Sequence, residues 1–132
     1  MNRASAQLLR ASLVVVWLAT AVVSVWELHG QSRELLAGLP TAWAGGHAPW
    51  LPTAIILAGA AADAVLGLWL ALRPGRQAYG AALLMMLAMT LLATAIQPAW
   101  WLHPFGPLTK NLPIAAILWV LRQDEATSLQ KP

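Results

Sequence analysis

The sequence predicts an all-α fold: an integral membrane four-helix bundle whose helices run up-down-up-down, with a long outer loop between helices 1 and 2. Apolar residues make up 59% of the 132 residues and charged residues only 10%, whereas soluble proteins have about 45–50% and about 25%. The uncharged residues gather into four runs of roughly membrane-spanning length. Polar or proline-containing stretches separate these runs. The chain is short enough to form a single domain over residues 1–132.

The first predicted span covers about residues 8–27. It reaches membrane length when it begins near Leu8, because the long side chain of Arg10 can extend to the interface. A cleavable signal peptide is the alternative, since basic residues precede the run and Ala-Thr-Ala at residues 19–21 resembles a cleavage site. The apolar run continues past that site to Trp26, which favours the membrane helix.

The second and third spans cover about residues 53–72 and 79–97, and both have the length of a membrane helix. Between them, residues 73–77 read Arg-Pro-Gly-Arg-Gln, which is typical of a tight turn. Such a short link predicts that the two spans are antiparallel neighbours.

The outer link over residues 28–52 is much longer and contains two glycines in succession and three prolines. We interpret it either as a solvated loop or as a short interfacial helix over the bundle. In the second case Ser32 would cap the helix and Trp43 would hold it at the interface.

The fourth span covers about residues 105–121 and has a proline-rich approach. Pro104 and Pro107 are expected to turn the chain at the outer interface, where the missing N–H of a proline at a helix start costs nothing. Pro113 is expected to lie within the helix, beyond its first residues. It therefore predicts a lost backbone hydrogen bond and a kink in the first turns.

Basic residues predict the orientation of the spans, because cytoplasmic loops collect lysine and arginine. Only Arg33 and Lys110 fall on the outer side; the other six are Arg3, Arg10, Arg73, Arg76, Arg122 and Lys131. We therefore place both termini in the cytoplasm. The tryptophans support this arrangement as an aromatic belt, with Trp26, Trp43, Trp50, Trp100 and Trp101 towards the outer ends and Trp69 and Trp119 near the inner ones.

The composition excludes several classes of function. The net charge of +3 does not indicate nucleic-acid binding, because the basic residues are scattered singly. The chain has no cysteine, which excludes disulfides and thiolate metal sites. No motif of a nucleophilic, phosphate-binding or paired-carboxylate enzyme stands out, so catalysis is the less favoured interpretation. Any redox role requires a cofactor or partner from outside the chain.

Asp63 is the first candidate site residue, because it lies near the middle of the second span, where a charge costs about 2.5–3.5 kcal/mol or more. Gly59 and Gly67 lie four residues to either side and share its helix face, which predicts the packed face of this span. The same face is equally suited to packing against a second copy of the chain. Asp63 is interpreted either as a hydrogen-bonding group that fixes the helix register or as a group that binds a ligand or handles protons.

Further polar residues lie near the outer ends of the spans. Glu27 and Lys110 have matching depths, so we predict an ion pair between spans one and four; a solvated Glu27 at a helix end is the alternative. Asp63 is a deeper second partner for Lys110. The remaining candidates form a small polar site of side chains roofed by two tryptophans: Gln97, His103 and Asn111, with Trp100 and Trp101. His103 alone favours an interfacial role, because no spaced second ligand predicts a metal.

The stretch HPFGPLTKNLP at residues 103–113, preceded by Gln97-Pro98 and Trp100-Trp101, resembles the last helix of DoxX-like small membrane proteins. Residues 63–70, DAVLGLWL, resemble the second span of that family more loosely. The resemblance implies a four-helix bundle of the inner membrane. It also implies an association with quinone-linked redox systems. Some relatives are fused to a nucleotide-binding domain, for which this chain has neither room nor a glycine-rich motif.

These observations favour a non-catalytic accessory or interaction subunit of a membrane redox system, in contact with the lipid bilayer and with a redox partner or further copies of itself. The first alternative is a quinone-linked oxidoreductase subunit, in which Asp63 and Lys110 exchange protons or bind a quinone carbonyl. The second is a small proton-coupled transporter that uses Asp63. No cofactor is expected from the chain itself, and quinone is the cofactor that the first alternative requires.

Overall fold

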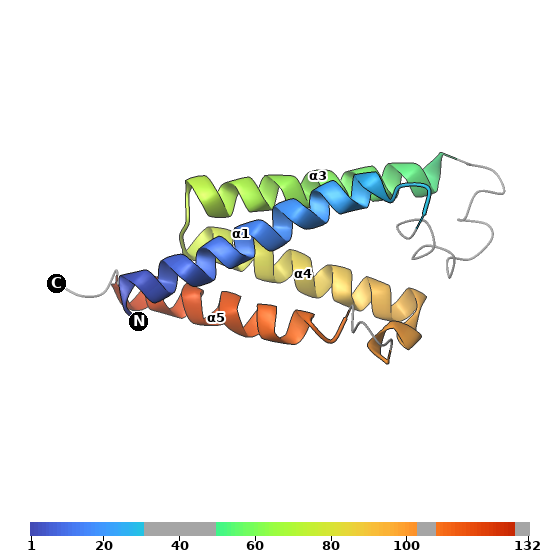
Figure 1. Ribbon diagram of the computed structural model, residues 1–132. Coiled ribbons are helices and arrows are strands. Elements are labelled where there is room, and N and C mark those ends of the chain that lie inside the picture. The colour runs from blue at the N-terminus through green and yellow to red at the C-terminus, as the bar shows by residue number, and fades with distance from the viewer. Residues whose placement is uncertain (31–49, 103–107, 129–132) are drawn as a thin grey trace.

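The structure, a computed structural model, describes residues 1–30, 50–102 and 108–128 and is all-helical over these ranges, without a strand. The all-α prediction is therefore confirmed for this part of the chain. The elements are α1 (Arg3–Trp26), α3 (Leu51–Leu72), α4 (Arg76–Ile96), the 3-10 helix η1 (Pro98–Trp101) and α5 (Asn111–Ser128) (Figure 1).

Several predictions of the loops fall on residues outside the described ranges. The interfacial helix with Ser32 and Trp43 is one of them, as is the turn at Pro104 and Pro107. His103 also lies outside the described residues.

α1 begins several residues earlier than its apolar run. The Asn2 side chain caps the helix, because its Oδ1 accepts a hydrogen bond of 2.7 Å from the backbone N–H of Ser5. The helix then continues without a break through residues 19–21 to Trp26. Ala21 is buried, so this region packs inside the bundle as a membrane helix is expected to do.

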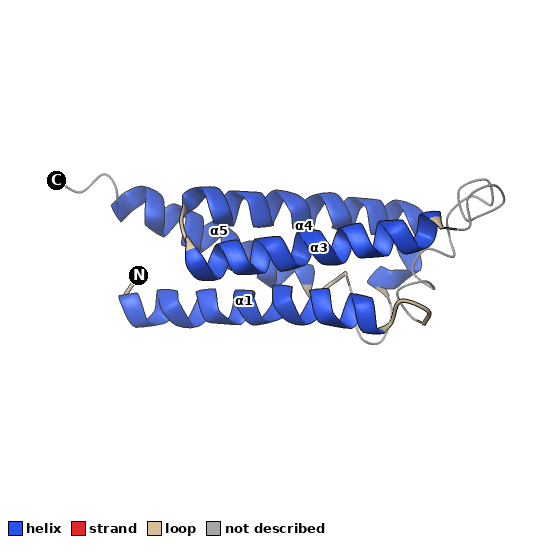
Figure 2. Ribbon diagram, turned by 90° about the horizontal axis from the view of Figure 1, so that it is seen from above, coloured by secondary structure: helices blue, strands red, loops and turns tan. Residues whose placement is uncertain are grey.

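The helices are arranged as two pairs, with α1 packed against α3 and α4 packed against α5 (Figures 1 and 2). The short link at residues 73–75 joins the pairs, and α3 and α4 contact each other less extensively than the partners within each pair. The amino group of Met1 forms an ion pair of 2.9 Å with Asp124 Oδ1. The first residue and the end of α5 therefore lie at the same end of the bundle.

All four helices share a core near that end. Its largest fully buried side chains are Leu13 of α1, Leu70 of α3 and Leu118 of α5, and α4 adds Tyr79, which is 2% exposed. Further out, the buried residues of α1 and α3 are small or β-branched: Ala21, Ile56 and Ala60. The two pairs are thus fastened together at one end of the bundle.

Gly67 and Gly59 of α3, both predicted to belong to one packed face, have different surroundings. A Cβ atom on Gly67 would lie 2.8 Å from Leu18 Cδ2 and 3.2 Å from Trp17 Cβ of α1. A Cβ atom on Gly59 would meet nothing within 4 Å. The predicted packed face is therefore correct at Gly67 and wrong at Gly59, because α1 closes onto α3 only where a glycine allows the backbones to approach.

Among the described residues, α1, α3 and α4 are long and apolar enough to cross a membrane. α5 differs, because Arg122, Asp124 and Glu125 occupy its last two turns. Its apolar part, residues 112–121, is about 15 Å long at a rise of 1.5 Å per residue. That is about half the thickness of a bilayer core.

The structure corrects the predicted start of the fourth helix. Residues 108–110 form a turn, and α5 begins at Asn111 rather than near residue 105. Pro113 is consequently the third residue of the helix. Its missing N–H falls in the first turn, where no intrahelical acceptor exists, so the predicted loss of a hydrogen bond and the resulting kink do not apply.

Replacing Gly67 by valine is expected to destabilise the protein by about 1–3 kcal/mol, because the new side chain overlaps Leu18 and Trp17. The measurement is the free energy of unfolding in detergent. Gly59→Val is the matched control on the same helix and is expected to change stability by less than about 0.5 kcal/mol. Equal losses in the two variants would contradict the close α1–α3 contact at Gly67.

Candidate functional site

Asp63 lies near the middle of α3, about 18 Å from its start and about 14 Å from its end at 1.5 Å per residue. Ile56 and Leu70, seven residues away on either side and therefore on the same helix face, are both buried. Asp63 thus belongs to the inward face of α3. Its side chain is nevertheless only half-buried. The two helix pairs pack closely between Asp63 and the end of the bundle where the termini lie, and less closely towards the other end.

The carboxylate of Asp63 makes no hydrogen bond or ion pair in the part of the chain that the structure describes. The interpretation of Asp63 as a hydrogen-bonding group that fixes the helix register therefore has no contact to support it. An ionisable group at mid-membrane depth on an inward face is typical of a group that contacts water, a proton or a ligand.

Lys110 is exposed in the turn before α5 and forms no ion pair within residues 1–30, 50–102 and 108–128. The predicted pair with Glu27 is thus absent there, as is the deeper pair with Asp63. The reason is the helix pairing: at its outer end α1 lies beside α3 and away from α5 (Figures 1 and 2). The Glu27 carboxylate lies instead against Gly30, in the turn that follows α1.

Asn111, the first residue of α5, is joined to α4 by a side-chain hydrogen bond. Its Nδ2 donates to Thr90 Oγ1 over 2.8 Å, and the Thr90 hydroxyl donates in turn to the carbonyl of Met86 over 2.7 Å. Thr90 lies about 9 Å below the outer end of α4. The start of α5 is therefore held to α4 well inside the apolar layer.

A second set of hydrogen bonds fastens η1 to the same face of α4. Trp101 Nε1 donates to Thr94 Oγ1 over 2.9 Å, and the Thr94 hydroxyl donates to the Thr90 carbonyl over 2.7 Å. Thr109 closes the set, because its hydroxyl donates to the carbonyl of Trp101 over 3.0 Å. We call these five residues, Thr90, Thr94, Trp101, Thr109 and Asn111, the outer polar network.

Within the outer polar network, the threonine hydroxyl protons are all donated to carbonyls of the bundle. The hydroxyls of Thr90 and Thr94 each accept one hydrogen bond and donate one, so neither has a proton left for a ligand. Its arrangement is that of a brace between α4, η1 and α5. The predicted polar site is thus formed in part, and the hydrogen bonds of its members run to other residues of the bundle.

The structure brings together only some of the predicted site residues. Asn111 and Trp101 join the outer polar network. Gln97 is exposed and ends α4, where its backbone N–H donates to Ala93 and its carbonyl accepts from Trp100. Trp100 is partly buried in η1. Within the described ranges, no group of three or more acidic, histidine or cysteine side chains is placed to hold a metal ion.

Thr90 and Thr94 were not identified from the sequence, although a signal was present. They are spaced by four residues in an otherwise apolar run, so they share one face of the third span. A threonine in a membrane helix can bond to its own helix, as Thr20 does to the Val16 carbonyl over 2.8 Å. What distinguishes Thr90 and Thr94 is a donor from another element, and that requires the tertiary structure.

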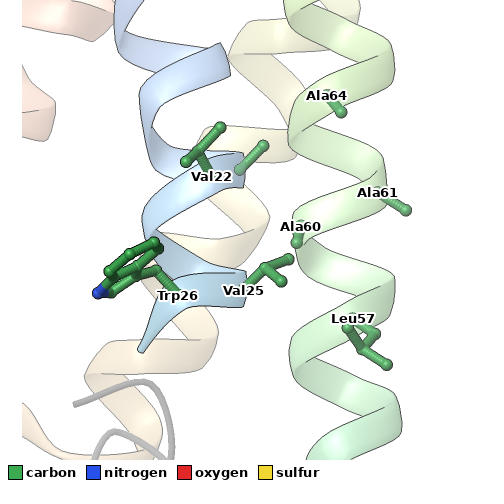
Figure 3. Close-up of a pocket in the computed structure, with 8 residues that line it drawn as sticks. Val22, Val25, Trp26, Leu57, Ala60, Ala61 and Ala64 are labelled. Carbon is green, nitrogen blue, oxygen red and sulfur yellow. The ribbon is translucent and has the colours of Figure 1, made fainter. Parts of the chain in front are cut away.

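A shallow groove of about 720 Å³ runs between α1 and α3 in their outer halves. Figure 3 shows the valines of α1 and the alanines of α3 on its two sides. The residues that line it are entirely apolar: Ala21, Val22, Val25, Trp26, Leu57, Ala60, Ala61 and Ala64. Its shape and chemistry suit an apolar partner.

A family model described as the DoxX-like family matches residues 14–119. This range runs from the first half of α1 to the middle of α5 and includes Asp63, Lys110 and the outer polar network. No curated protein and no solved structure matches the chain.

Thr90→Val and Asn111→Leu are expected to be coupled by about 0.5–1.7 kcal/mol in a double-mutant cycle, because they share one hydrogen bond inside the apolar layer. The free energy of unfolding in detergent measures this coupling. Thr20→Val is the control partner, since its hydroxyl bonds only within α1. Strict additivity of Thr90→Val with Asn111→Leu would rule out the brace.

Proposed function

The chain belongs to the DoxX-like family and is a small membrane protein, and we propose that it serves as a non-catalytic accessory subunit of a membrane redox system. In this proposal all four helices cross the inner membrane in an up-down-up-down order, with both termini in the cytoplasm. The ion pair between Met1 and Asp124 supports an even number of crossings, because it requires the two ends of the bundle sequence to lie on one side.

The observation that carries the proposal is the α1–α3 groove. Lipid chains are as apolar as helix surfaces, so helices associate in a bilayer through close packing at small side chains. Ala60, Ala61 and Ala64 form such a surface on α3. On the α1 side, Val22 is 65% exposed, so the groove has no cover among the described residues.

We assign the groove to a membrane helix of the catalytic partner subunit. A helix is a rigid rod that follows a straight groove between two other helices, and small residues on one side let its backbone approach closely. The redox character of this partner rests on the resemblance of residues 97–113 to the family's last helix. An accessory role also agrees with the outer polar network, whose hydrogen bonds are spent on bracing the bundle.

Ala61→Leu fills the groove and is expected to lower the recovery of the partner by about fivefold or more, because overpacking costs about 1–3 kcal/mol. The measurement is mild-detergent purification from native membranes, with the partner identified by its subunit mass and by the absorbance of its flavin, haem or quinone. Ala88→Leu is the matched control, since Ala88 is an exposed alanine on α4 outside the groove. Equal recovery in both variants, or purification of the chain only with itself, would contradict the proposal.

Asp63 favours a second function. A carboxyl group at mid-membrane depth without a partner in the described chain is suited to exchange a proton or to bind a quinone carbonyl. In this role the protein is a quinone-linked oxidoreductase subunit or a small proton-coupled transporter. Lys110, also without an ion pair in the described residues, is a second charged group that could take part.

Asp63→Asn separates this second function from a structural role. Because Asp63 makes no hydrogen bond or ion pair in the described chain, the free energy of unfolding of the variant is expected to lie within about 0.5 kcal/mol of the parent's. Quinone-dependent absorbance changes, or proton-coupled uptake into reconstituted vesicles, are expected to fall at least about tenfold, as for a lost functional carboxylate. Glu125→Gln, in the last turns of α5, is the control. A loss of stability with these activities unchanged would leave Asp63 a purely structural residue.

A further inference from the structure

The turn between α3 and α4 encloses a second hollow, at the end of the bundle where the termini lie. Its volume is about 650 Å³, and its lining is more polar than that of the α1–α3 groove. The residues that form it come from the last turn of α3, the link and the first turn of α4: Trp69, Arg73, Pro74, Gly75, Arg76, Gln77 and Ala78.

Two positive charges in this hollow are not neutralised by any residue that the structure describes. Arg73 and Arg76 are both exposed, and neither makes an ion pair or a side-chain hydrogen bond in the described chain. No acidic residue lines the hollow, and none occupies the first turn of α4. At the same end of the bundle, by contrast, the charge of the Met1 amino group is paired with Asp124.

The hollow also lies at the boundary between lipid and water. Arg73 directly follows the last residue of α3, Leu72, and Arg76 is the first residue of α4, so both arginines lie at the ends of candidate membrane spans. Beside them, on the membrane side, Trp69 is 38% exposed and Leu72 is 76% exposed. Tryptophan prefers the depth of the lipid headgroups, which is also the depth of the lipid phosphates.

We propose that this hollow binds the phosphate of an anionic phospholipid in the leaflet on the side of the termini. Guanidinium groups pair with phosphate oxygens through two parallel hydrogen bonds, so Arg73 and Arg76 together suit one phosphate. Trp69 and Leu72 offer an apolar surface to the acyl chains of the same molecule. A free phosphate ion could pair with the same two arginines, but it would not contact Trp69 or Leu72 and would leave the rest of the hollow unfilled.

The lipid site is independent of the α1–α3 groove and of Asp63. It lies at the opposite end of α3 from the groove, and none of its residues lines the groove. A lipid held there bridges α3 and α4, which belong to different helix pairs. The bound lipid therefore reinforces the only short link between the pairs.

Native mass spectrometry of the full chain, released from micelles that contain phosphatidylglycerol or phosphatidylcholine, tests this site. We expect retained phosphatidylglycerol to exceed phosphatidylcholine. Arg73→Gln and Arg76→Gln are each expected to lower retention about fivefold, and the double variant about 25-fold, because each guanidinium contributes its own hydrogen bonds to the phosphate in the hollow. Both side chains are exposed and unbonded in the described chain, so the single variants are expected to keep the fold.

Arg3→Gln is the control, because it removes one exposed charge from the same end of the bundle outside the hollow; less than a twofold change is expected. Arg73→Lys with Arg76→Lys is expected to recover part of the retention. Equal retention of the two lipids, or an unchanged double variant, would overturn the site. Displacement of phosphatidylglycerol by millimolar inorganic phosphate, with the same dependence on Arg73 and Arg76, would overturn the lipid as its occupant and leave a site for soluble phosphate.

Discussion

Polar groups that enter the apolar layer have no water to bond with, and this constraint determines how the chain is built. The backbone meets it by forming helices, and the side chains of Thr20, Thr90 and Thr94 meet it by donating to carbonyls of their own helices. Asn111 cannot do the same at the start of α5, so its amide reaches across to Thr90. The hydrogen bonds between elements thus gather where α5 begins, and they compensate for the short apolar length of that helix.

The charged groups are also subject to the lack of water in the apolar layer, but several of them have no ionic partner within the described chain. Asp124 is paired with the Met1 amino group at the end of the bundle, whereas Asp63, Lys110, Arg73 and Arg76 have no ionic partner in the described chain. These four groups stand at three levels of the bundle: Asp63 near the middle of α3, Lys110 before the start of α5, and Arg73 and Arg76 together at the α3–α4 link. The described chain therefore leaves charged groups without an ionic partner at three levels.

Much of the fold could be predicted from the sequence because lipid imposes a simple pattern. The runs that became α1, α3 and α4 are long, apolar and bounded by turns, and their positions agree with the predicted spans to within a few residues at most boundaries. The helix pairs could not be predicted, because they depend on the close approach at Gly67, and alanine and leucine dominate every span alike. The predicted pair of Glu27 and Lys110 failed for this reason: matching depth says nothing about which helices are neighbours. The outer polar network could be predicted only in part from the sequence. Asn111 is conspicuous in an apolar run, whereas threonine is common in membrane helices and does not attract notice.

The core shared by all four helices also fixes the order in which the protein can be completed. Chains are synthesised from the N-terminus, so α1 and α3 can pair through Gly67 while the rest of the chain is still being made. Leu118 and Leu121, which close the core against Leu13 and Leu70, arrive last, as does Asp124 for the Met1 amino group. Until α5 arrives, α1 and α4 lack their contacts with it, and the Met1 amino group lacks its ionic partner. The core shared by the four helices is therefore complete only when the last helix to be synthesised has joined the bundle.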